Sequence, residues 1–161
     1  MFDNEIALNE FSLGLFSRIA ADIPEASLFQ PSAGHGHPPV WILGHLAICA
    51  ELGQKLLGGT LAHPRWMVLF GPGSSDGIAD DGTLNLKDLV EANTKGYAKL
   101  REMAAQADPE RMSQPHGVEL LNGTAIRTVG QLVSHLLTSH FAFHQSQLSS
   151  CRREIGHQAL F

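Results

Sequence analysis

Apolar residues recur every three or four positions in four long stretches of this chain, and no stretch shows the strict alternation of a strand. The expected helices run over 3–22, 38–58, 86–106 and 128–155. In the first of them we expect a buried stripe made of Leu8, Phe11, Leu15 and Ile19. This pattern predicts an all-α protein, arranged as an antiparallel four-helix bundle with two long connections.

Local signals mark the ends of these helices. Pro38 and Pro39 suit a first helical turn, and Gly58 suits a C-terminal cap. Asn85 is the expected N-cap of the third helix. The stretch "TVGQ" (128–131) has the form of a capping box, which predicts a helix start there.

The two long connections cover 59–84 and 107–127. In the first, we expect a short turn over 66–70 and an irregular tail rich in Gly, Ser and Asp. A connection of this length is often a lid or a binding loop. In the second, 118–127 is interpreted as a small extended hairpin that turns at Asn122 and Gly123.

Length and charge exclude several classes of protein. The 161 residues predict one domain spanning 1–161, and the net charge of −5 argues against nucleic acid or an anionic membrane as the main partner. Two distant cysteines and the lack of a basic, apolar leader favour a cytoplasmic protein, with no membrane-length apolar run.

Three of the nine histidines are predicted to point into the core. Taking about 100° per residue and His140 as the reference, His144 falls about 40° away on the apolar face of the fourth helix. His135 falls about 140° away, so we expect it to be exposed and uninvolved. His45 lies in the middle of the apolar face of the second helix.

Buried imidazoles need partners, and these apolar faces carry no Asp or Glu at their centres. An unpaired buried polar group costs about 1–3 kcal/mol. Hydrogen bonds to buried carbonyls are one solution, and a divalent metal such as Zn²⁺, Ni²⁺, Fe²⁺ or Co²⁺ is the other. Three imidazole ligands leave one position open for water or substrate, which is typical of catalytic sites.

The sequence pattern leaves two alternative roles for each of three other residues near this site. Cys49 and Cys151 are the nearest candidates for a fourth ligand, although we interpret both as small buried hydrophobic residues. Gln147 lies about 20° from His140, where it could orient a ligand histidine or contact metal-bound water. A helix residue bonded to a neighbouring loop is the alternative.

Two segments resemble the signature segments of the DinB/YfiT-like metalloenzyme superfamily: "WILGHLA" (41–47) and "SHFAFHQSQLSSCRREIG" (139–156). The resemblance implies a four-helix bundle of up-down-down-up order that binds a divalent metal. The implied ligands are His45, His140 and His144. The chain departs from the family pattern at Gln145 and Ser146, where relatives usually have a glycine at the second position.

Relatives in that bacterial family include S-transferases and isomerases that use low-molecular-weight thiols, namely bacillithiol and mycothiol. The resemblance therefore implies a thiol-dependent enzyme acting on a small molecule. Independently of the resemblance, we expect Trp41, Trp66 and Phe70 either to shape the substrate pocket or to pack in the core. Members often dimerise, so a homodimer is one expectation. A metal-dependent hydrolase is an alternative, weakened by the lack of a general base beside the histidines. A non-catalytic, metal-stabilised stress-response or binding module is another.

Overall fold

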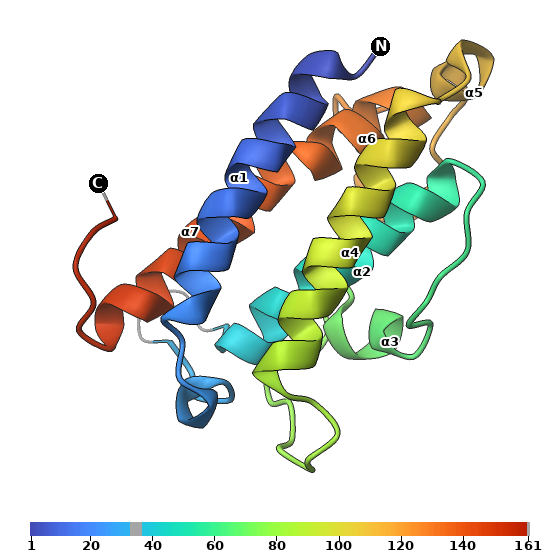
Figure 1. Cartoon of the computed structure of the whole chain (residues 1–161). Coiled ribbons are helices and arrows are strands. Elements are labelled where there is room, and N and C mark those ends of the chain that lie inside the picture. Colours follow the sequence, from blue (N-terminus) through green and yellow to red (C-terminus); the bar gives the residue numbers. More distant parts are fainter. Residues whose placement is uncertain (33–36, 161) are drawn as a thin grey trace.

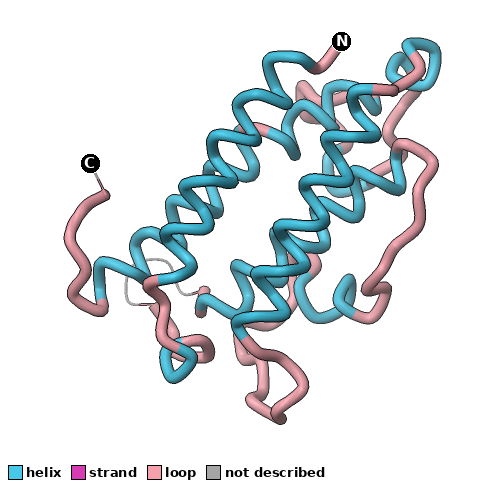
Figure 2. The backbone as a smooth tube through the Cα atoms, in the orientation of Figure 1, coloured by secondary structure: helices cyan, strands magenta, loops and turns pink. Residues whose placement is uncertain are grey.

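The computed structural model describes residues 1–32 and 37–160, so His35 lies outside the described residues. Five long helices run through the molecule: α1 Asp3–Ala21, α2 Pro39–Leu56, α4 Leu86–Ala105, α6 Val129–Leu137 and α7 Ser139–Glu154 (Figure 1). Short elements lie between them: α3 Trp66–Phe70, α5 Pro109–Ser113 and 3₁₀ turns at Glu25–Ser27 and Glu119–Leu121. The all-α prediction is confirmed, since the described residues contain one isolated bridge and no strand (Figure 2).

Most of the local signals act as expected. The Asn85 side chain accepts a hydrogen bond from the Asp88 backbone N–H at 2.8 Å, which caps α4. Thr128 and Gln131 form the reciprocal capping box at the start of α6. Pro39 occupies the first turn of α2, and the predicted short turn in the first connection is α3.

Helix α2 is the central element. It contacts α4, α3, α6 and α7, and most of its side chains are buried, on every side of the helix. Helix α1 packs on the other side of the molecule, against α4, α6 and α7. A helix that is apolar all round belongs in the middle of a protein, so residues on opposite faces of α2 face two different buried environments.

The predicted buried stripe of α1 is wrong at Leu8 and Phe11, whereas Ile19 is buried as expected and Leu15 is half-buried. Leu8 is 57% exposed and Phe11 is 65% exposed, while Leu13 and Phe16 are buried. Asn9 explains the rotation, because it is wholly buried: its Nδ2 donates to the Leu137 carbonyl at 2.8 Å, and its Oδ1 accepts from Arg101 at 2.9 Å. These two bonds turn the Asn9 face inward, and apolar spacing alone did not reveal them.

The single helix predicted over 128–155 is two helices, α6 and α7. Thr138 separates them, with φ −122° and ψ −91°, and its hydroxyl donates to the Ser134 carbonyl at 2.6 Å. The Leu137 carbonyl would accept from Phe141 in a continuous helix, and here it accepts from the Asn9 side chain instead. The break is therefore stabilised by local back-bonding of a threonine and by a polar residue of α1.

The hairpin predicted over 118–127 is also wrong. Its first part is the 3₁₀ turn at Glu119–Leu121, and Gly123 takes a positive φ of 82° in the turn that follows. His116 closes this segment, because its Nε2 lies 3.1 Å from the Ile126 carbonyl and its Nδ1 accepts from the Val118 N–H at 2.9 Å. The His116 side chain thus closes the segment together with the isolated bridge between Pro115 and Thr128.

Within the described ranges, no helix has both the length and the apolar character needed to cross a membrane.

Candidate metal centre

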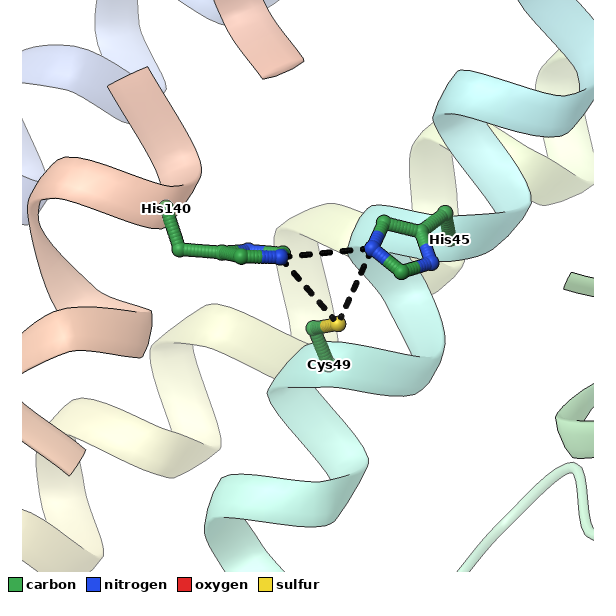
Figure 3. Close-up of side chains that lie close together, drawn as sticks. All are labelled: His45, Cys49 and His140. Carbon is green, nitrogen blue, oxygen red and sulfur yellow. Dashed lines mark hydrogen bonds between the residues drawn. The ribbon is translucent and has the colours of Figure 1, made fainter. Parts of the chain in front are cut away.

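Helices α2 and α7 bring two histidines and a cysteine together (Figure 3). His45 and Cys49 are buried, and His140 is half-buried. The Nε2 atoms of His45 and His140 are 3.2 Å apart. The Cys49 sulfur lies 3.6 Å from the His45 Nε2 and 3.9 Å from the His140 Nε2. These three ligand atoms lie within 4.8 Å of one another, so this group, called here the His–Cys–His cluster, could hold a metal ion.

Simple helix geometry accounts for the two α2 members of the cluster. His45 and Cys49 are four residues apart, and side chains at that spacing share a helix face. His140 comes from the first turn of α7, immediately after the break at Thr138. The third member of the cluster is therefore positioned by the same break that ends α6.

The main chain of α3 fixes the orientation of the His45 ring. Its Nδ1–H donates to the Phe70 carbonyl at 2.7 Å, which leaves the Nε2 lone pair directed at the cluster. Gly44 makes this approach possible, because a Cβ at that position would clash with the Phe70 ring. The Trp41 ring stacks on the His45 ring with centroids 4.6 Å apart, which holds the imidazole plane.

His144 lies beside the cluster but is not one of its three members. Its ring centroid is 4.5 Å from that of His45 and 4.6 Å from that of His140. Its Nδ1–H donates to the Gln147 Oε1 at 2.7 Å, so its Nε2 keeps the lone pair. Gln147 thus holds one tautomer of His144, as the Phe70 carbonyl does for His45.

Burial keeps these imidazoles in the neutral, ligand-competent form. It lowers the pKa of His140 to about 3 and that of His144 to about 4, and repulsion from the neighbouring histidines adds to both shifts. The pKa of His45 is lowered by the same cause. Burial raises the pKa of the Cys49 thiol to about 12, so without a cation this sulfur keeps its proton.

The donor set fits a divalent metal. Two neutral imidazoles present their Nε2 atoms to each other, and the Cys49 sulfur lies beside both nitrogens. A hydrogen bond between the Nε2 atoms needs a proton on one of them, whereas a cation would bind both nitrogens and the sulfur through their lone pairs. Nitrogen and sulfur donors together are typical ligands of zinc and similar borderline metals.

The aromatic residues predicted to shape a pocket lie in different places. Trp41 packs directly on His45, and Phe70 is wholly buried. Trp66 stacks on His63 and lines a groove of about 490 Å³ between α2, α3 and α4, which none of the cluster residues line. Of the three, Trp66 alone lines this groove, and its ring meets that of Phe70 edge-on with centroids 5.8 Å apart.

One expectation near the site changes with the structure. His135 was expected to be exposed, but it is half-buried, and its ring contacts that of His140 at 5.4 Å between centroids. The break at Thr138 causes this, because the helical phase counted back from His140 does not continue into α6. Ser146 is exposed, while Gln145 is buried and donates to the Ser12 carbonyl of α1 at 3.2 Å.

Sequence reasoning missed two ionic contacts around α2. Glu51 is 4% exposed and binds His63 through the backbone N–H at 2.9 Å and through Nδ1 at 2.6 Å. His37, whose ring stacks on Trp41, forms an ion pair with Asp76. The 12- and 39-residue separations of these pairs left no local signal. The i, i+4 spacing of His45 and Cys49 was visible, however, and was interpreted as core packing.

Comparison with known proteins identifies one family. The model of the DinB superfamily matches residues 10–148, which is most of the chain. No match was found among curated proteins or among solved structures. The matched range includes α2 and the part of α7 that carries the histidines. This protein is a member of the DinB superfamily.

Proposed function

We propose that this protein is a metal-dependent enzyme whose divalent metal, Zn²⁺, Ni²⁺ or Fe²⁺, is bound between α2 and α7 by His45, His140 and His144. In this proposal the chain is one domain, a bundle of up-down-down-up order in which α6 and α7 together make the fourth helix. The observation that carries the proposal is the approach of the Nε2 atoms of the buried His45 and the half-buried His140 to 3.2 Å.

The protein's own groups prepare this site for a cation. The Phe70 carbonyl and the Gln147 amide oxygen hold the Nδ1 protons of His45 and His144, so that both Nε2 atoms are free to coordinate. Helix packing excludes water from His45, which is 4% exposed. A bound metal would act as a Lewis acid and lower the pKa of a coordinated thiol or water to a value near neutral pH.

We propose a thiol-dependent transferase or isomerase as the reaction class, with a low-molecular-weight thiol and a small electrophile as reactants. The composition of the site supports this choice. The His–Cys–His cluster contains no carboxylate, and the nearby acid Asp76 is engaged with His37. A hydrolase that relies on a carboxylate base beside its metal is therefore less well supported.

The test is a thiol-consumption assay on protein freed of metal and then loaded with zinc, nickel or iron. A small alkylating electrophile is offered with a panel of low-molecular-weight thiols. We expect thiol consumption that requires the metal and is lost in His45→Ala. The control is His157→Ala, which should keep the activity because His157 lies outside the cluster, with its Nδ1 3.7 Å from Asp22. Equal consumption with and without metal would contradict the proposal.

One observation favours a second function, a non-catalytic module stabilised by its metal. The Cys49 sulfur stands next to two imidazole nitrogens, and zinc sites with four protein ligands that include cysteine are structural. In that case metal would raise the thermal midpoint of unfolding strongly, and no thiol or electrophile would be consumed. Thermal scans run beside the assay separate the two functions.

A further inference from the structure

We propose that Cys49 is itself a metal ligand, bound through its sulfur, so that the site is a mixed imidazole and thiolate centre. This inference rests on the metal-binding part of the proposed function and is independent of whether the protein catalyses a reaction. It changes the ligand set implied by the resemblance, which contains histidine only.

The distances within the cluster are those of a tetrahedral metal site. Zinc binds nitrogen at about 2.0–2.1 Å and sulfur at about 2.3 Å, so in a tetrahedron two nitrogens are about 3.3 Å apart and a nitrogen and a sulfur about 3.6 Å apart. The corresponding distances here are 3.2 Å between the imidazole nitrogens, and 3.6 and 3.9 Å from the sulfur to each of them. One cation could contact all three atoms with little movement.

Sulfur ligation has a chemical consequence for the metal. When the thiol binds, its proton passes to the solvent and the sulfur replaces a water of the incoming ion. A thiolate favours zinc, cobalt and nickel over magnesium and manganese, which prefer oxygen ligands. With His144 as a further donor, a small molecule would reach the metal as a fifth ligand or by displacing one of the four.

Cobalt substitution is a direct test, because a thiolate bound to Co²⁺ gives an intense near-ultraviolet charge-transfer band and imidazole ligands do not. The matched control is the second cysteine, Cys151, which is also buried but lies near the end of α7. We expect the band in the wild-type protein and in Cys151→Ala, and its loss in Cys49→Ala. Cobalt affinity should fall by about tenfold or more when the ligand is removed.

A measurement on the unaltered protein guards against a variant that misfolds. X-ray absorption of the zinc-loaded wild type should show a zinc–sulfur distance of about 2.3 Å beside nitrogen at about 2.0–2.1 Å. Only nitrogen and oxygen neighbours, or a charge-transfer band that persists in folded Cys49→Ala, would overturn the sulfur ligand. Failure of the wild type to bind cobalt or zinc at all would instead overturn the metal site of the proposed function.

Discussion

Two faces of α2 each bury a polar side chain beside a histidine. They differ in whether the buried polar atoms are paired as donor and acceptor. On the face toward α3, both carboxylate oxygens of Glu51 accept hydrogen bonds from His63. On the face toward α7, about 120° around the helix from Glu51, the Nε2 atoms of His45 and His140 and the Cys49 sulfur converge without a carboxylate among them. A paired donor and acceptor indicate a structural contact, whereas converging lone-pair donors fit a bound cation.

The largest effect that this comparison predicts is on metal affinity. Replacing His140 by Ala should weaken zinc binding by more than about 100-fold, beyond the loss typical of outer residues. The matched change on the other face, His63→Ala, should leave zinc affinity within a few fold. Isothermal titration of metal-free protein measures both, and similar losses in the two variants would show that the faces do not differ in function.

The free energy of unfolding should show the opposite pattern, with the larger loss at Glu51 and the smaller one at His140. Glu51→Ala leaves the His63 backbone N–H without its acceptor and frees the loop before α3, so the free energy of unfolding should fall by about 1–3 kcal/mol. Urea denaturation of the metal-free protein gives this value. His140→Ala should destabilise the metal-free protein less than Glu51→Ala does, and a larger loss would indicate that the cluster is structural without metal.

Acid should destabilise the metal-free protein mainly through His140 and His144 of α7. The pKa values of His140 and His144 are lowered to about 3 and about 4, so the unfolded chain binds more protons than the folded one below the ordinary histidine pKa of about 6.5. The metal-free protein should therefore lose stability as the pH falls from about 6.5 toward those lowered values. Urea denaturation at several pH values should give a shallower loss for His140→Gln. An identical pH dependence in both proteins would contradict this assignment.

A smaller effect is expected at Gln147, which contacts His144 and is not a member of the cluster. Gln147→Ala removes the acceptor that holds the His144 Nδ1–H, and zinc affinity should drop by about tenfold. The neighbouring exposed residue provides the control, because Ser146→Ala should change nothing. If the two variants bind zinc equally well, His144 contributes nothing to the site.

The smallest effect is predicted for His135→Ala. This side chain is half-buried, and its Nδ1 lies 2.7 Å from the Ser139 hydroxyl, outside the cluster. Zinc affinity should change by less than about twofold and stability by less than about 0.5 kcal/mol. A tenfold loss of affinity by the same titration would mean that the cluster extends into α6.

Local chemistry explains which parts of this fold were predictable from the sequence. The Asn85 cap and the Thr128–Gln131 capping box are contacts within three residues, and the structure has them as predicted. The break at Thr138 depends on Asn9, whose bond to the Leu137 carbonyl spans 128 positions. Apolar periodicity carries no information about such a bond, so one long helix was expected, and the phase of His135 was wrong.

The same distinction holds for the candidate site. His45 and His140 stood out because each interrupts an apolar face, which is a local pattern. Cys49 blended into its face, since a buried thiol and a small hydrophobic residue look alike in a sequence. Only the packing of α2 on α7 shows that its sulfur meets two imidazoles, and only the path of the loop before α3 shows that Glu51 meets His63.

The most direct test of the metal centre is anomalous diffraction at the zinc edge from crystals of zinc-loaded protein. We predict one strong peak per chain, about 2.0–2.1 Å from the Nε2 atoms of His45 and His140. A peak beside Glu51 and His63, or no peak between α2 and α7, would contradict the account.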